Sequence, residues 1–389
     1  MQQLKNIDGA STLRRRRITH PDKPLQLDSG ETLAPVDIAF ETWGTLSPNK
    51  DNVIVVCHAL TGDQFPAGSN PITERPAWWP RMIGPGLPVD TNRFYVIATN
   101  VLGGCMGSTG PASLAPDGEP YGLRFPTITI ADMVRAQIAL LDNLGIDKIF
   151  CVMGGSMGGM QVLEWARQAG DRVQTAIPIA TSARQSAQNI GFYEVGRQAI
   201  MADPNWCDGA YLAKGTRPDR GLGVARMAAH ITYVSEEALK QKFDRRLQNR
   251  DKFTFGFDAD FQIESYLRYQ GATFVDRFDA NSYLYITRAM DYFDLLDTEN
   301  ALSNIKARIC VFSFSSDWHY TPDESKALVR ALNAADIETS YVSLETTKGH
   351  DAFLLEEPEF EAALAGFISS AADTHNIAKP SNSENGGAN

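Results

Sequence analysis

The sequence has little of what marks membrane-spanning and disulfide-stabilised proteins. No run approaches the roughly 20 apolar residues of a membrane span, and no apolar stretch of the signal-peptide type occurs near residue 1. Only five cysteines occur in 389 residues; they lie far apart and form no CxxC pair. We therefore expect no membrane association and a reducing compartment, the cytoplasm.

The sequence also lacks an excess of positive charge. It has 36 Lys and Arg against 47 Asp and Glu, a net charge of -11. This balance argues against nucleic acid or an anionic membrane surface as the main partner, because both require a positive face. The one basic run, Arg14 to Arg17, is typical of a solvated arm, which we place at residues 1–24. An anionic substrate such as a CoA thioester would need a local basic mouth, about which the total charge says nothing.

Short apolar runs alternate with helical patterns along most of the chain. Such runs, separated by amphipathic helices, are typical of a mostly parallel sheet covered on both faces, so the sequence predicts a doubly wound α/β fold. An antiparallel hairpin is expected within 25–43, with its turn at 28–30. Further strands are predicted at 53–57, 94–98, 149–153, 176–180, 309–314 and 340–344, and helices at 130–144, 157–168, 323–333 and 358–369.

The strand signal fades between residues 182 and 304, where helical patterns rich in Arg, Tyr, Phe and Met replace it. We interpret this stretch as a helical lid inserted into a core formed by residues 25–181 and 305–373, with the substrate pocket beneath the lid. Residues 374–389, rich in Asn, Ser and Gly, are expected to be a disordered tail.

A GxSxG motif stands at 154–158, between a predicted strand and a predicted helix. This is the context of the nucleophile elbow of the α/β-hydrolase fold, which makes Ser156 the expected nucleophile. The elbow also places Ser156 at a helix N-terminus, so the backbone N–H of Met157 is expected to be one oxyanion donor. The alternative is a glycine-rich turn that binds phosphate or merely changes the chain direction.

In this fold, the acid and the histidine follow the nucleophile, on loops after later strands. Asp317 follows the predicted strand 309–314 and His350 follows the strand 340–344, so Asp317 is expected to orient His350, the general base. His319 could line the pocket, as could the aromatic residues Tyr233, Trp318 and Tyr320. Histidines with partners at metal-binding spacing are lacking, so no metal site is expected.

The second oxyanion donor is expected from the loop after an early core strand. Here the strand 53–57 precedes His58-Ala59-Leu60-Thr61-Gly62, and the N–H of Leu60 is the candidate. For His58 we favour a structural role, with its ring bonded to nearby backbone, because His350 already occupies the position of the base.

Several longer motifs resemble the homoserine O-acyltransferase family. They are G-G-S-M-G-G-M-Q-V-L-E-W-A (154–166), H-A-L-T-G (58–62), N-V-L-G-G-C-M-G-S-T-G-P (100–111) and G-H-D-A-F-L (349–354), with three lid segments at 186–200, 221–233 and 278–294. The resemblance spans about residues 25–370. It implies acyl transfer from acyl-CoA to the hydroxyl of L-homoserine by a homodimer, without metal or prosthetic group.

The same resemblance assigns two binding residues, Arg226 for the substrate carboxylate and Asp351 for its ammonium. The paired N–H donors of an arginine bind a carboxylate well, and a carboxylate binds an ammonium group, so both assignments are chemically reasonable. Without the family, Arg226 is better interpreted as a surface ion-pair residue and Asp351 as a helix cap.

The sequence motifs do not determine which acyl group is transferred. Acetyl-type members of the family tend to have two apolar residues after the Asp-Trp pair, and succinyl-type members have arginine first; this sequence has His319-Tyr320. A polar His319 could bond a succinyl carboxylate, yet the rest of the chain favours acetyl-CoA over succinyl-CoA. Serine as the acceptor, a serine esterase and a catalytically silent binding protein are the alternatives.

Overall fold

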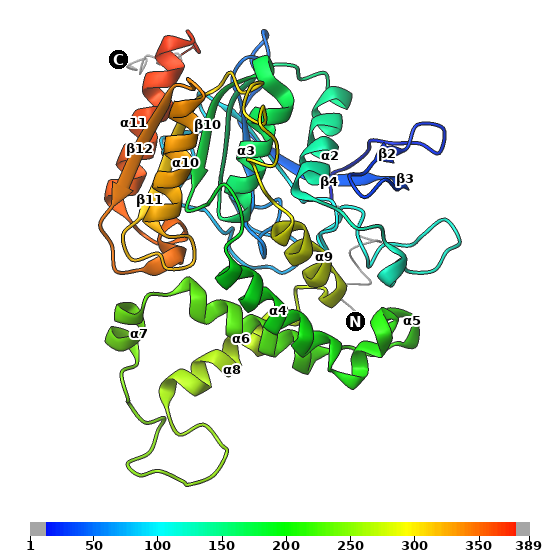
Figure 1. Ribbon diagram of the computed structural model, residues 1–389, viewed down its shortest axis with the longest axis vertical. Coiled ribbons are helices and arrows are strands. Elements are labelled where there is room, and N and C mark those ends of the chain that lie inside the picture. The colour runs from blue at the N-terminus through cyan, green and yellow to red at the C-terminus, as the bar shows by residue number, and fades with distance from the viewer. Residues whose placement is uncertain (1–12, 379–389) are drawn as a thin grey trace, which may run out of the picture.

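The structure, a computed structural model, describes residues 13–378. Its centre is an eight-stranded sheet with strand order β1-β4-β8-β5-β9-β10-β11-β12 (Figure 1). Neighbouring strands from β8 to β12 in this order are parallel, whereas β4 and β1 join one edge in antiparallel pairing. The strands are β1 (Arg15–Arg17), β4 (Asp37–Trp43), β8 (Tyr95–Thr99), β5 (Val53–Cys57), β9 (Ile149–Gly155), β10 (Val173–Ile179), β11 (Arg308–Phe314) and β12 (Thr339–Leu344).

The sheet is buried on both faces, which explains the continuous apolar runs of its central strands. In β5, Val53 and Val55 pack into one hydrophobic cluster, while Ile54 and Val56 pack into the cluster on the opposite face. The first cluster is closed by α2 (Ile130–Asn143), α3 (Met157–Ala169) and α10 (Pro322–Ala334), and the second by α11 (Pro358–Thr374). The predicted α/β fold, its strands and its four core helices are therefore confirmed, with bounds shifted by a few residues.

Only helices and loops connect β10 to β11, apart from isolated bridges. The helices are α4 (Ala187–Met201), α5 (Tyr211–Lys214), α6 (Asp219–Tyr233), α7 (Glu236–Lys242), α8 (Gln262–Phe274) and α9 (Ala280–Asp291). In Figure 1 this segment, residues 182–304, which we call the lid, lies beyond one end of the sheet, with α4 packed on α6 and α6 on α8. No helix within residues 13–378 is long and apolar enough to cross a membrane.

The expectations for the ends of the chain need correction. Arg15–Arg17 do not form a free arm but add an exposed edge strand, in which Arg17 is paired with Asp37 at 2.7 Å. The expected hairpin is present as β2 (Leu25–Gln26) and β3 (Thr32–Leu33). At the other end, α11 continues to Thr374 and Ile377 is buried, so the expected tail does not begin at 374. Residues 379–389 lie outside the described part of the chain.

The parallel pair β5–β9 comes unusually close to the helix that follows it. A Cβ atom added to Gly154 would lie 2.4 Å from the carbonyl oxygen of Cys57, and one added to Gly158 would lie 2.2 Å from the same oxygen. Contacts this short require backbone movement, so both glycines are needed for α3 to begin directly at the end of β9.

We expect Gly154→Ala to lower the free energy of unfolding by about 1–3 kcal/mol, because the new methyl group has no room beside Cys57. Gly366 is the matched control: it is an exposed position of α11 with nothing within 4 Å of an added Cβ. Gly366→Ala should stabilise by about 0.5–1 kcal/mol. Urea unfolding measures both; equal stability of the two variants would contradict the close packing.

Candidate active site

Ser156 lies at the turn between β9 and α3, in a backbone conformation that side-chain-bearing residues rarely adopt. Its φ is 60° and its ψ is -124°, and it is the N-cap residue of α3 without a side-chain capping bond. Its N–H donates to the carbonyl of Ile179 at 2.9 Å, which holds the turn. The hydroxyl is therefore directed by a strained, firmly packed turn and is not used for capping.

His350 and Asp317 are brought together from the ends of two neighbouring strands. Asp317 follows β11, and His350 lies in the short helix η4 (Gly349–Leu354) after β12. The His350 Nδ1 is 2.8 Å from the Asp317 Oδ2, and both residues are 2% exposed. The other carboxylate oxygen of Asp317 accepts the N–H groups of His319 and Tyr320, each at 2.9 Å. Asp317 is thus fixed by its own loop, and it fixes the ring.

The environment of His350 sets its protonation. Burial acts to lower the pKa of the ring, but the charge and hydrogen bond of Asp317 outweigh it, so the pKa is raised above the ordinary 6.5. Because Asp317 accepts the proton on Nδ1, the neutral ring presents an unprotonated Nε2. Such a nitrogen is suited to act as a base.

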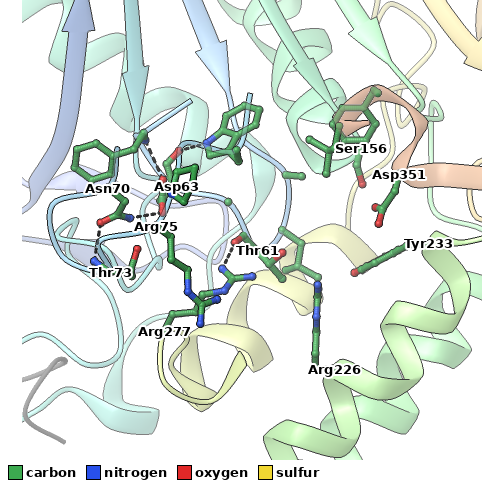
Figure 2. A pocket seen from close by; sticks show the side chains of 18 of the residues that line it. Thr61, Asp63, Asn70, Thr73, Arg75, Ser156, Arg226, Tyr233, Arg277 and Asp351 are labelled. Atoms are coloured by element: carbon green, nitrogen blue, oxygen red, sulfur yellow. Dashed lines mark hydrogen bonds between the residues drawn. The ribbon is translucent and has the colours of Figure 1, made fainter. Parts of the chain in front are cut away.

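A cavity of about 1080 Å³, including its open mouth, joins Ser156 and His350. Leu60, Arg226, Tyr233 and Asp351 line it as well, and Figure 2 shows several of these side chains around the space. No hydrogen bond between the Ser156 hydroxyl and the His350 ring is present among the described residues. Catalytic hydrogen bonds of this kind are often long until substrate binds.

The loop at 58–62 is held rigidly against the core. The His58 Nδ1 is 2.7 Å from the Ala59 carbonyl and its Nε2 accepts the Val101 N–H at 3.2 Å, the structural role expected from the sequence. Gln161, on α3, donates to the His58 carbonyl at 3.0 Å. Among the described residues the Leu60 N–H has no acceptor, and Leu60 lines the cavity, while Met157 begins α3. Both N–H groups are thus free to bind an oxyanion.

Arg226 and Asp351 reach the cavity from the lid and from the loop that carries His350. The Arg226 guanidinium lies 5.6 Å from the centre of the Tyr233 ring and 5.2 Å from that of Phe274. It takes part in no ion pair with a described residue. Burial raises the pKa of the Asp351 carboxyl, although the charges of His350 and Arg226 oppose this. An unpaired guanidinium and a carboxyl group thus share the cavity with Ser156.

The structure corrects the expected position of His319. It is 2% exposed and is not among the residues that line the cavity, and the centre of its ring lies 5.0 Å from that of the His350 ring. Its Nε2 is 3.2 Å from the Tyr193 hydroxyl. Tyr320 is fully buried and Trp318 is also absent from the cavity wall, so of the aromatic candidates only Tyr233 lines it.

Three charged residues of the cavity wall were missed by sequence reasoning: Asp63, Arg75 and Arg277. Asp63 and Arg75 lie in the loop after β5 and Arg277 lies between α8 and α9, and no spacing signal connects them with Ser156. Within residues 13–378 no group of three or more His, Cys, Asp or Glu residues could hold a metal ion.

The parallel sheet, the strained serine turn and the histidine and aspartate on later loops define an α/β hydrolase, and residues 52–354 match the alpha/beta hydrolase fold family. The chain is 62% identical over 357 residues to the homoserine O-acetyltransferase of Mesorhizobium japonicum, covering 90% of this chain and 92% of that protein. It belongs to the homoserine O-acetyltransferase family and is an acyltransferase, so the resemblance seen in the motifs is confirmed.

Two solved structures with the same fold have names that indicate different reactions. The homoserine O-acetyltransferase of Bacillus anthracis has a TM-score of 0.82 at 26% identity, covering 92% of this chain and 97% of that one. Esterase E22 has the same TM-score at 29% identity, covering 92% of this chain and all of the other. The architecture is therefore common to acyl transfer and ester hydrolysis.

We predict that Asp317→Asn lowers the pKa of His350 below 6.5, because burial is then opposed only by the charge of Asp351. In the unmodified protein the raised pKa adds stability below the ordinary histidine pKa, and this contribution is lost as the pH rises through the folded-state value. The variant should show the reverse dependence, with stability lost as the pH falls through the ordinary histidine pKa. Titration of the ring by NMR measures the shift, and an unchanged pKa would show that Asp317 does not control His350.

Proposed function

We propose that this enzyme transfers an acetyl group from acetyl-CoA to the side-chain hydroxyl of L-homoserine, in methionine biosynthesis, through an acyl-Ser156 intermediate. One observation carries the proposal: a single cavity contains both a serine with a buried, carboxylate-bonded histidine and an unpaired guanidinium beside a carboxyl group. The first pair suits acyl transfer and the second suits an amino acid, and the relatives at 53–62% identity are named for that reaction.

In the first half-reaction, the Nε2 of His350 takes the hydroxyl proton while the Ser156 Oγ attacks the thioester carbonyl. The N–H groups of Met157 and Leu60 donate hydrogen bonds to the carbonyl oxygen and stabilise the negative charge that develops on it. The C–S bond then breaks, His350 returns its proton to the CoA thiolate, and acetyl-Ser156 remains.

In the second half-reaction homoserine enters, with its carboxylate on Arg226 and its ammonium on Asp351. His350 removes the proton of the substrate hydroxyl, whose oxygen attacks the acyl carbon in the same oxyanion site. The ester bond to Ser156 breaks, and His350 protonates the serine. Ping-pong kinetics follow, because CoA leaves before homoserine is acylated.

Transfer requires that water does not reach acetyl-Ser156 first. Ser156 is only 5% exposed, and the lid contributes Tyr233 and Arg226 to the wall of its cavity. An acceptor held in the attacking geometry competes with water through its high effective concentration. Homoserine differs from serine by one methylene, which changes the binding free energy by only about 1–3 kcal/mol. We therefore base the choice of homoserine as the acceptor on the names of the relatives.

The acyl donor is proposed to be acetyl-CoA. His319, the residue that a succinyl carboxylate would need, is 2% exposed and is not among the residues that line the cavity. The scheme uses side chains and backbone N–H groups of this chain with acyl-CoA as a co-substrate, and it assigns no step to a metal or prosthetic group.

We further propose a cytoplasmic homodimer. All five cysteines are free thiols, four of them buried, which suits a reducing compartment. The lid exposes apolar side chains, among them Val195, Val224 and Ile231, which suit contact with a second copy.

An esterase is the second candidate, because esterase E22 shares the architecture at the same TM-score as the transferase. The two differ in what releases the acyl group. A transferase retains acetyl-Ser156 until homoserine arrives, whereas an esterase discharges it to water.

We predict that homoserine accelerates CoA release from acetyl-CoA and that Arg226→Gln raises the KM for homoserine about 10- to 100-fold, the worth of one charged hydrogen bond. Thiol release without homoserine should not change in this variant. Ser156→Ala is the control and should release no CoA under either condition. A release rate that is independent of homoserine would identify an esterase and contradict the proposed function.

A further inference from the structure

The wall of the cavity contains three arginines against two aspartates, Asp63 and Asp351, although the protein as a whole is acidic. The chain has a net charge of -11, yet three arginines, Arg75, Arg226 and Arg277, line the cavity that contains Ser156. A negatively charged protein repels an anionic substrate at long range, so binding such a substrate requires local positive charge. The amino-acid carboxylate accounts for Arg226 only. Arg75 and Arg277 remain without an assigned partner.

Arg277 is a partly buried residue whose guanidinium forms no ion pair with a carboxylate among the described residues. One nitrogen, Nη1, donates to the carbonyl of Thr61 at 2.8 Å, and the group lies 5.2 Å from the centre of the Phe274 ring. Burial and, next, the charge of Arg226 lower its pKa to about 10, although the charge of Asp63 opposes them. Its positive charge is thus poorly compensated.

The nearest acidic candidate, Asp63, does not neutralise Arg277 by direct pairing. One of its carboxylate oxygens accepts the N–H of Phe65 at 2.9 Å, and the other accepts the amide of Asn70 at 2.8 Å. Burial raises the pKa of the Asp63 carboxyl, although the charge of Arg277 opposes this. Asp63 therefore organises its own loop.

Arg75 lies at the outer part of the same wall. It is exposed, and its guanidinium has no ion pair or hydrogen bond with a described residue. In Figure 2 the side chains of Arg75 and Arg277 overlap and Arg226 lies apart from them, and the charges of both Arg226 and Arg75 lower the pKa of Arg277. Arginine binds planar or tetrahedral oxyanions with two parallel N–H bonds.

We propose that Arg75 and Arg277 form a second anion subsite, separate from Arg226, that binds an oxyanion group of the acyl donor. The inference rests on the proposed function and specifies which chemical group of the acyl donor the enzyme binds. The phosphates of the CoA tail and the carboxylate of a dicarboxylic acyl group are two sources of this chemistry, and the phosphates are expected because acetyl is the proposed acyl group.

The test compares donors with and without phosphate. Thiol release is followed at limiting concentrations of acetyl-CoA and of S-acetylpantetheine, which lacks every phosphate. Arg75→Gln should lower kcat/KM for acetyl-CoA roughly tenfold, and the double variant with Arg277→Gln roughly 100-fold. The value for S-acetylpantetheine should stay close to that of the unmodified enzyme, and Arg277→Lys should restore much of the loss because it keeps the charge.

Controls separate this effect from general ones. Arg330→Gln removes the same charge from an exposed position of α10 that does not line the cavity, and it should leave both donors unaffected. S-succinylpantetheine tests the other source: if it reacts better than S-acetylpantetheine and the variants abolish the difference, the subsite binds the acyl carboxylate.

Three results would overturn the inference. Equal losses for both acetyl donors would show that Arg277 only supports the Thr61 loop. No loss with either donor would show that the arginines bind nothing in the donor, and a raised KM for homoserine alone would assign them to the acceptor. Failure of the proposed function looks different, because the unmodified enzyme would then release thiol at a rate that is independent of homoserine, or would release none, whatever the response of the arginine variants to the donor.

Discussion

The strained backbone of Ser156 is the constraint on which the rest of the site depends. A residue with φ of 60° and ψ of -124° costs about 1–3 kcal/mol and persists only where its surroundings over-determine it. Here the surroundings are the close approach of β5, β9 and the start of α3, which only glycine at 154 and 158 permits. This turn places the hydroxyl at the carboxyl ends of the strands, where the loops after β11 and β12 supply Asp317 and His350. The core alone thus determines where Ser156, Asp317 and His350 lie, and the lid covers them.

Much of this arrangement could be predicted from local pattern. Apolar runs gave the central strands to within a few residues, and the order of Ser156, Asp317 and His350 along the chain predicted which loops would meet. What failed has a physical reason. His319 stands two residues after Asp317, but the Asp317 carboxylate accepts its N–H in a tight turn, and its ring packs against the His350 ring and not into the cavity. Nothing in the sequence specifies that turn.

The electrostatics of the cavity could not be predicted either, because the charges come together only in the folded chain. Arg75 lies in a loop after β5, and Arg277 lies between α8 and α9, so no periodicity or spacing connects them. The negative net charge of the chain gives no indication of these arginines. A shared architecture also hides this level of detail, since an esterase and an acetyltransferase resemble the chain equally in backbone. In the proposed function, side chains such as Arg226 and Asp351 therefore make the selection between water and an amino acid.

The most direct test of the central claim is the mass of the intact protein after mixing with acetyl-CoA in the absence of homoserine. The account predicts an increase of one acetyl group, located on Ser156 by peptide mapping, that disappears rapidly when homoserine is added and slowly in buffer. An enzyme that turns over without ever carrying the acetyl group on Ser156, or one whose adduct is lost equally fast with and without homoserine, would contradict it.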